Sequence, residues 1–327
     1  MERRRLGRTG LQTSVLGYGA GAVGGLMVRG SAAEHERAIA RAVELGINYI
    51  DTAPSYGDGA SETHLGRVLA KLRPDIVLGT KVRLPAIAPG QIGEAIVRSL
   101  EDSLRRLGRD QVDLFQLHNP ITAQGAAATL TPAVVLNEVR AAFERLRQQG
   151  KTRFIGITAV GETAPLRKVV DARAFDTAQV VYNMLNPTAG AAVPAGMPGQ
   201  DYGRLLDHTR QADMGVIGIR ALAAGALSGS EARHPIAMPQ VDPIGSAATY
   251  NADVARARRF EALVREGHAG SLIEAALRFV IAQTGVTTML VGTASLDELE
   301  AAAAAVAKGP LSAAVLQRAA DISASAA

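Results

Sequence analysis

The stretch that decides the fold runs from residue 76 to residue 118. It opens with the apolar segment IVLGTK (76–81), continues through QIGEAIVRSLEDSLRRL (91–107) and closes with a second apolar segment, VDLFQLH (112–118). The middle segment has the spacing of an amphipathic helix, with one apolar face and one charged face. Its apolar face consists of Ile92, Ile96, Leu100, Leu104 and Leu107. Short apolar runs joined by such a helix are typical of parallel strands that are buried on both faces.

The same alternation of strand and helix continues from one end of the chain to the other. Eight segments are expected to be strands: 14–19, 47–51, 76–81, 112–118, 153–158, 178–183, 215–220 and 287–292. Ser31 and Ser61 stand where the N-caps of two helices are expected. No linker rich in Pro, Gly or Ser divides these units, so we expect a closed eight-stranded parallel (β/α)₈ TIM barrel as a single domain over residues 1–327. The first dozen residues precede these units and are expected to cap the barrel floor.

Composition excludes several classes of protein. Hydrophobic residues make up 47% and charged residues 20% of the chain, which is typical of a globular protein. No apolar run approaches the roughly 18–20 residues that cross a bilayer, and no apolar signal segment follows the basic N-terminus, so we expect a cytoplasmic protein without a membrane partner. The absence of cysteine excludes disulfides and thiolate chemistry. The net charge of +4 is spread along the chain and aromatics are only 4%, so nucleic acid is not an expected partner.

Three connections are too long to be simple turns between a strand and a helix. They span residues 119–132, 186–202 and 228–251, and each follows an expected strand. In a barrel all three would open on the C-terminal face, where active sites form. Disordered insertions are the alternative interpretation.

A Gly-rich motif follows the first expected strand. Residues 19–24 match GxGxxG, but a dinucleotide fingerprint requires a helix to begin directly at that loop. The next expected helix begins near Ser31, so a Rossmann domain is the less favoured alternative.

Polar residues stand at the ends of consecutive strands. Asp51 closes the second strand, Tyr56 follows it in DTAPSYGDG, Lys81 closes the third strand and His118 closes the fourth. Taken singly, these residues could be a turn cap, a rim aromatic, a snorkelling lysine and a core histidine. In a barrel, however, neighbouring strand ends converge on one mouth, and we therefore expect the four side chains to form one site. None of the six histidines belongs to a ligand-spaced cluster, so no metal site is expected.

Together these four residues predict a side chain that donates a proton to a carbonyl compound. A phenol has a pKa of about 10, and a nearby ammonium favours its ionised form. Lys81 is expected to make Tyr56 a better proton donor, with Asp51 as the counter-charge of the lysine. His118 is expected to hydrogen-bond and orient a substrate carbonyl oxygen. Such a site suits the reduction of a carbonyl, for which a nicotinamide cofactor must supply the hydride.

At this point the sequence resembles the aldo-keto reductase family over nearly its whole length. The resemblance is carried by LGRTGLQTSVLGYG, GINYIDTAPSYGDGASETHLGRVL, GTKVR, SLEDSLRRLGRDQVDLFQLHNP, KTRFIGIT, QVVYNMLNP and GVIGIRALAAGALSG. It implies a (β/α)₈ fold without a Rossmann domain, an extended NAD or NADP over the C-terminal face, and hydride transfer to a small-molecule aldehyde or ketone, or from the matching alcohol. It places the family's catalytic tetrad on Asp51, Tyr56, Lys81 and His118, with Tyr56 as the proton donor.

The family's cofactor positions match this chain less well. The family usually holds the carboxamide with Ser-Asn and Gln, whereas this chain has Thr158-Ala159 and Gln179, so one amide contact is missing. An aromatic followed by Ser is replaced by Ile219, which would cover the ring, and Arg220, which would clamp the pyrophosphate or else be a solvated rim charge. The full expected set of cofactor contacts is Gly19, Ala20, Asp51, Thr158, Gln179, Ile219, Arg220, Leu222, Ala223, Gly225, Gly292, Thr293, Ser295 and Glu298.

The segment after the eighth strand bears on the choice of cofactor. No cation lies between Leu290 and Lys308, Glu298 stands where the family usually has Gln or Arg, and Ala302 replaces an Asn. A carboxylate repels a 2′-phosphate but accepts hydrogen bonds from ribose hydroxyls, so a relative preference for NAD over NADP is expected.

Two other functions are compatible with a barrel of this kind. One is a Schiff-base aldolase-type enzyme that uses Lys81, and the other is a cofactor-binding regulatory barrel with little turnover. The presence of all four strand-end residues favours the reductase.

Overall fold

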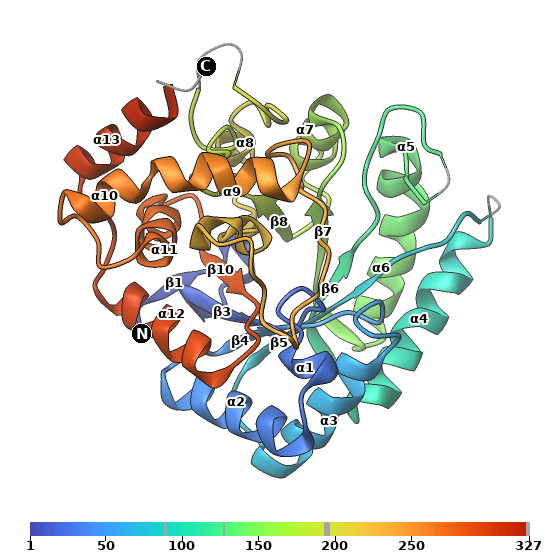
Figure 1. The fold of residues 1–327 in the computed structure, drawn as a ribbon. Coiled ribbons are helices and arrows are strands. Elements are labelled where there is room, and N and C mark those ends of the chain that lie inside the picture. The colour runs from blue at the N-terminus through green and yellow to red at the C-terminus, as the bar shows by residue number, and fades with distance from the viewer. Residues whose placement is uncertain (88–89, 127, 193–196, 325–327) are drawn as a thin grey trace.

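Eight parallel strands close into a barrel that is surrounded by helices (Figure 1). The computed structural model describes residues 1–87, 90–126, 128–192 and 197–324. The barrel strands are β3 (Leu16–Gly19), β4 (Tyr49–Asp51), β5 (Val77–Val82), β6 (Val112–Leu117), β7 (Thr152–Ala159), β8 (Thr177–Val181), β9 (Gly215–Ile219) and β10 (Thr288–Val291). Their order around the barrel follows the chain, and β10 closes the ring against β3. The predicted fold and all eight predicted strands are confirmed.

Helices cover the outside of the barrel wall (Figure 1). They are α1 (Leu26–Arg29), α2 (Ala32–Glu44), α3 (Ala60–Leu72), α4 (Ile92–Leu107), α5 (Pro132–Val134), α6 (Arg140–Gln148), α7 (Thr163–Asp171), α8 (Leu205–Gln211), α9 (Tyr250–Arg259), α10 (Glu261–Arg265), α11 (Leu272–Ala282), α12 (Leu296–Ala307) and α13 (Ala313–Ala324). The five apolar residues predicted to form the inner face of α4 are all buried. None of the helices in the described ranges is long and apolar enough to cross a membrane.

Two predictions about helix starts are decided by capping contacts. Ser31 caps α2, because its side chain accepts from the backbone N–H of Glu34 while the Glu34 carboxylate accepts from Ser31. The prediction for Ser61 was wrong, since α3 begins earlier, at a cap formed by Gly59 with a φ of 86°. Ser61 lies inside the first turn, and its hydroxyl donates to the Ala20 carbonyl at 2.8 Å.

The Gly-rich segment 19–24 also differs from the prediction. The one-turn helix α1 begins at Leu26, well before Ser31. This segment lies at the end of a strand in a closed barrel rather than in a doubly wound sheet. The expectation that the chain does not form a Rossmann fold is therefore confirmed, although the predicted start of the next helix, near Ser31, was wrong.

The N-terminal residues cap the barrel floor, as predicted. Strands β1 (Arg3–Arg5) and β2 (Gln12–Ser14) form an antiparallel hairpin, and Leu6 in the turn between them is fully buried. Leu6 packs with inward-facing residues of four barrel strands, Tyr49, Val77, Leu114 and Ile217. Leu6 thus acts as a plug that closes the floor of the barrel. A side chain at position 215 would lie 2.7 Å from Leu6, so Gly215 leaves room for the plug.

We expect Leu6→Ala to destabilise the protein by about 2–5 kcal/mol, because it leaves a cavity that the barrel wall cannot fill. The free energy of unfolding in urea measures this effect. Arg3→Ala in the same hairpin is the control, since Arg3 is exposed and its loss is expected to cost no more than about 0.5 kcal/mol. Equal stability of the two variants would show that Leu6 does not act as a plug.

The three long connections lie at the C-terminal ends of strands β6, β8 and β9. Residues 127 and 193–196 within them lie outside the described part of the chain. The connection after β9 crosses to the loop after β3 (Figure 1), where the backbone N–H of Met238 donates to the Val23 carbonyl at 3.0 Å. The Arg29 side chain donates to the Ile236 carbonyl in the same region. This crossing segment therefore borders the barrel mouth.

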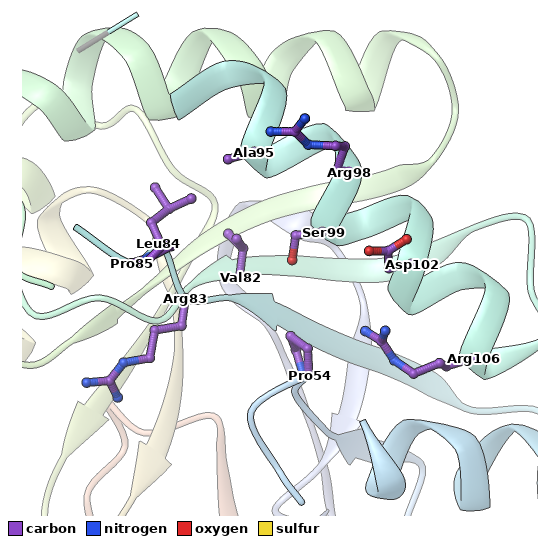
Figure 2. Close-up of a pocket in the computed structure, with 10 residues that line it drawn as sticks. All are labelled: Pro54, Val82, Arg83, Leu84, Pro85, Ala95, Arg98, Ser99, Asp102 and Arg106. Atoms are coloured by element: carbon purple, nitrogen blue, oxygen red, sulfur yellow. The ribbon is translucent and has the colours of Figure 1, made fainter. Parts of the chain in front are cut away.

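A surface pocket lies between the end of β5 and helix α4 (Figure 2). Its lining includes Val82 of the strand and Ser99 and Asp102 of the helix. Successive side chains of a strand point to opposite faces, so Val82 faces the helix layer while Lys81 faces the barrel interior. The pocket therefore lies behind the barrel wall, outside the mouth.

Candidate active site

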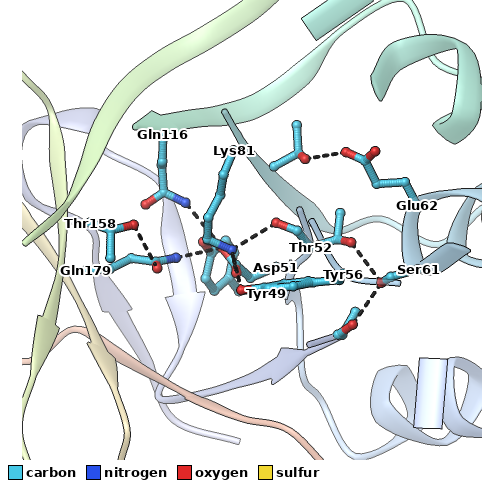
Figure 3. A network of polar contacts seen from close by, with 12 residues as sticks. Tyr49, Asp51, Thr52, Tyr56, Ser61, Glu62, Lys81, Gln116, Thr158 and Gln179 are labelled. Carbon is cyan, nitrogen blue, oxygen red and sulfur yellow. Dashed lines mark hydrogen bonds and ion pairs between the residues drawn. The ribbon is translucent and has the colours of Figure 1, made fainter. Parts of the chain in front are cut away.

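The barrel interior holds a buried ion pair at its C-terminal end (Figure 3). Lys81 is 0% exposed, and its ammonium donates to the Asp51 carboxylate. The same ammonium donates to the Thr52 carbonyl at 2.9 Å and contacts the Tyr56 hydroxyl at 3.2 Å. All of the hydrogens of the ammonium thus have acceptors, and one of these is the predicted proton donor.

The Asp51 carboxylate also accepts from three neutral side chains, all of them on its Oδ2 atom. The donors are the hydroxyl of Tyr49 at 2.9 Å and the amides of Gln179 at 2.8 Å and Gln116 at 3.2 Å. A side chain at Gly79 would lie 2.9 Å from the Tyr49 hydroxyl and 3.3 Å from Asp51 Oδ2, so a glycine there keeps space for this network.

The sequence contained signals for two of these donors that the prediction did not use. Tyr49 precedes Asp51 by two residues and therefore points to the same side of its strand. Gln116 lies beside Lys81 in the β5–β6 register and is the polar exception in the apolar run VDLFQLH. Inward-pointing polar residues in buried strands identify both.

The hydrogen-bond network keeps Lys81 protonated. Burial alone would lower the pKa of Lys81, but the Asp51 carboxylate and the Tyr56 oxygen outweigh it, and the pKa is raised above its ordinary value. Burial, together with the Asp51 charge, also raises the pKa of Tyr49 well above that of a free phenol, so Tyr49 keeps its proton and acts as a donor. Lys81 stays charged, and all of the hydrogens of its ammonium are already hydrogen-bonded. It is therefore a poor nucleophile, which opposes the Schiff-base alternative.

Tyr56 reaches this network from the loop between β4 and α3. Positive φ values at Gly57, Asp58 and Gly59 turn the chain directly after the tyrosine. The Lys81 ammonium lies 4.8 Å from the centre of the Tyr56 ring, and the hydroxyl points toward it (Figure 3). The predicted pairing of phenol and ammonium is therefore present in the structure.

His118 follows β6 and lies edge-on to the Tyr56 ring, with ring centres 5.9 Å apart and planes at 90°. Its Nδ1 atom is buried without a hydrogen-bond partner among the described residues. Burial, reinforced by the positive charges of Lys81 and Arg83, lowers the pKa of His118 to about 3. The ring is therefore neutral at physiological pH. It can donate a hydrogen bond to a carbonyl oxygen, but it is a much weaker acid than a protonated histidine ring.

The folded state should therefore resist protonation of His118. A histidine in an unfolded chain has a pKa of about 6.5, so between that pH and about 3 the unfolded state binds a proton that the folded state does not. The free energy of unfolding therefore falls as the pH falls through that window, because protonation of His118 favours the unfolded state. We expect His118→Gln to weaken this pH dependence. Urea unfolding between about pH 7 and about pH 5 measures the effect, and a His118 proton resonance that titrates near 6.5 in the native protein would contradict it.

The predicted cofactor residues lie around the same mouth but differ in exposure. The residues with accessible surface are Gly19, Ile219, Arg220, Leu222, Gly225, Gly292, Ser295 and Glu298. The buried ones are Ala20, Asp51, Thr158, Gln179, Ala223 and Thr293. Gln179 is engaged with Asp51 through its nitrogen and with the Thr158 hydroxyl, at 3.4 Å, through its oxygen. Glu298 accepts from the backbone N–H of Ala294 at 2.7 Å.

One part of the rim suits a dinucleotide. The ends of β3 and β10 bring Gly19 and Gly292 together, and a side chain at Gly19 would lie 3.3 Å from the Gly292 nitrogen. At the end of the next strand, β9, stands Arg220, whose guanidinium donates to the Asp242 carbonyl at 3.1 Å. A rim without side chains beside a cation fits the close approach of a pyrophosphate. No group of three or more His, Asp or Glu in the described part of the chain could hold a metal ion.

Comparisons with known proteins agree with this geometry. The model of the aldo/keto reductase family matches residues 15–324. The chain belongs to the aldo/keto reductase family. Members of this family are oxidoreductases of carbonyl and sugar substrates that use NAD(P)H.

Relatives with named activities match the chain over most of its length. It is 29% identical to an L-galactose dehydrogenase from Arabidopsis thaliana, over 94% of this chain and 88% of that protein. It is 26% identical to an L-glyceraldehyde 3-phosphate reductase from Escherichia coli, over 92% of this chain and 86% of that protein. The holo form of aldo-keto reductase AKR11C1 from Bacillus halodurans has a similar fold, with a TM-score of 0.74 and 26% identity over 100% of this chain and 97% of that chain.

Proposed function

We propose that this member of the family reduces an aldehyde or ketone with NAD(P)H, or oxidises the matching alcohol or sugar, with Tyr56 as the proton donor. The supporting observation is the Tyr56 hydroxyl 3.2 Å from the ammonium of Lys81, which is itself held by Asp51. An ammonium at this distance stabilises the phenolate that remains after the tyrosine has given up its proton.

Each of the four residues has a separate task in this proposal. His118 hydrogen-bonds the carbonyl oxygen and so orients the carbonyl carbon for attack. The hydride for that carbon would come from a reduced nicotinamide, when one is bound. Tyr56 gives its proton to the carbonyl oxygen, so that one hydride and one proton convert the carbonyl to an alcohol. Lys81 stabilises the resulting phenolate, and Asp51 keeps Lys81 charged.

The cofactor would be held along the ends of strands β7, β8, β9, β10 and β3. Thr158 and Gln179 would face its carboxamide, and Ile219 would cover the ring. Arg220 would bind the pyrophosphate where the glycine rim allows a close approach. The buried Gln179–Asp51 contact gives this part of the site a fixed position.

A panel of aldehydes, ketones and aldoses, assayed with NADH and with NADPH, tests the proposal. We expect loss of reduced-nicotinamide absorbance with at least one carbonyl class. Cofactor binding without turnover on the whole panel would instead support the regulatory barrel.

We expect Tyr56→Phe to lower kcat for carbonyl reduction by roughly 10²–10⁴-fold, because it removes the proton donor. The Kd for the cofactor, measured by fluorescence titration, should stay close to that of the wild type. Tyr182→Phe is the control, since it removes a hydroxyl from a tyrosine that stacks on Phe279 outside the site. Reduction by Tyr56→Phe at nearly the wild-type rate would contradict the mechanism.

We also propose a relative preference for NADH over NADPH. Glu298 is exposed at the start of α12, and its carboxylate would repel a 2′-phosphate while accepting hydrogen bonds from ribose hydroxyls. The ratio of kcat/KM for the two cofactors measures this preference, and Glu298→Gln should shift the ratio toward NADPH. A roughly tenfold or larger advantage of NADPH in the wild type, about 1.4 kcal/mol, would contradict the role of Glu298.

A further inference from the structure

Arg83 occupies the position beside His118 on the wall of the mouth. Arg83 directly follows strand β5, and the alternation of side chains, continued by one residue beyond the strand, would place it on the same side as Lys81. In the β5–β6 register Val82 lies beside Leu117, and the backbone N–H of His118 donates to the Val82 carbonyl at 2.8 Å. That bond completes the Val82–Leu117 pair, with which the ladder ends, so Arg83 and His118 are the residues that directly follow the last pair of two strands about 4.8 Å apart.

The guanidinium of Arg83 has no counter-charge within the described ranges. Arg83 is exposed, and it forms no ion pair or hydrogen bond with a described residue. Arg83 lines the surface pocket of Figure 2 together with Asp102 of helix α4, but its side chain points away from that helix and forms no ion pair with Asp102. Arg106, on that helix, is instead paired with the buried Glu62. The positive charge of Arg83 is therefore not paired with a carboxylate of any described residue.

The second arginine of the mouth lies on the opposite side. Strands β5 and β9 are four places apart in the closed ring of eight, so Arg83 and Arg220 face each other across the barrel. Arg220 is next to the glycine rim, donates to the Asp242 carbonyl and interacts with the charge of the Tyr56 oxygen, whereas Arg83 interacts with His118. Of the two cations, Arg83 is therefore the one on the His118 side of the mouth.

We propose that Arg83 binds an anionic group of the substrate, so that the enzyme prefers carbonyl compounds that carry a carboxylate or a phosphate close to the carbonyl. The inference rests on the proposed function, because it assumes that the carbonyl oxygen lies on His118. A guanidinium offers two parallel N–H donors to a carboxylate or phosphate, which fixes the orientation of the substrate as well as binding it. Of the two positive charges that act on His118, Lys81 is already paired with Asp51, whereas Arg83 has no ion-pair partner among the described residues. Short oxo-acids and acidic or phosphorylated sugars have this chemistry.

Pairs of related substrates, one with an anionic group and one without it, test the inference. Succinic semialdehyde is compared with its methyl ester for the carboxylate, and glyceraldehyde 3-phosphate with glyceraldehyde for the phosphate. The readout is the ratio of kcat/KM, anionic over neutral, in the wild type, in Arg83→Gln and in Arg98→Gln. Arg98 is an exposed arginine on α4, on the other side of the strand, and so controls for the loss of one positive charge.

We expect at least one anionic substrate to exceed its neutral partner by about tenfold or more in the wild type and in Arg98→Gln. In Arg83→Gln that ratio should fall by roughly 10- to 100-fold, the usual effect of losing a charged hydrogen-bond pair. The pair that responds identifies the carboxylate or the phosphate. A ratio near one in the wild type, or a ratio that Arg83→Gln leaves unchanged, would overturn the inference while the proposed function stands.

A binding measurement separates this inference from turnover. Succinate and inorganic phosphate have no aldehyde or ketone group to reduce, and calorimetry reports their Kd directly. We expect at least one of the two to bind the wild type and Arg98→Gln about tenfold or more tightly than Arg83→Gln. Equal binding to all three proteins would refute the role of Arg83 even in an active reductase. Failure of every carbonyl to turn over, with this binding difference intact, would count against the proposed function alone.

Discussion

The structure of the mouth depends on one buried carboxylate. Removing Asp51 and Lys81 from water costs several kcal/mol per ion, and their mutual attraction offsets this only if the remaining hydrogen-bonding positions are filled. Here Tyr49, Gln116 and Gln179 fill them from three strands, β4, β6 and β8. Because these strands hold their relative positions only in a closed barrel, the fold itself keeps the ion pair stable. The charge next to the Tyr56 hydroxyl is therefore a consequence of barrel closure.

The same closure divides the mouth into two unlike halves. At the ends of β3 and β10, glycines leave a rim without side chains, and Arg220 lies at the adjacent end of β9. At the ends of β5 and β6, Arg83 and His118 directly follow the last paired residues of the two strands, Val82 and Leu117. An extended, doubly charged cofactor needs close access to the backbone, whereas a small substrate needs directed side-chain contacts. The two halves match these two requirements.

The sequence predicts those features that repeat or that stand at strand ends. Eight apolar segments separated by helices give the barrel, and polar residues at strand ends give Asp51, Lys81 and His118. It does not predict features that depend on exact turn geometry, since three consecutive positive φ values start α3 before Ser61. Tyr49 and Gln116 were missed for another reason: each is an inward-pointing polar residue of a buried strand, a signal that is present in the sequence but that says nothing of its partner. That Gln116 reaches Asp51 depends on strand order and register, which one sequence does not specify.

The balance of charge in the mouth connects substrate choice with catalysis. Lys81 is paired with Asp51, and His118 is neutral. The positive charge beside the proposed carbonyl position that has no ion-pair partner in the described part of the chain therefore comes from Arg83 on the His118 side and from Arg220 across the mouth. When a hydride reaches a carbonyl carbon, negative charge develops on the oxygen, and a fixed positive environment stabilises that charge without reorganising. The field that would attract an anionic substrate thus also favours the transition state of reduction. Substrate preference and reactivity would then share one electrostatic origin, placed by the register of β5 and β6 rather than by the long loops.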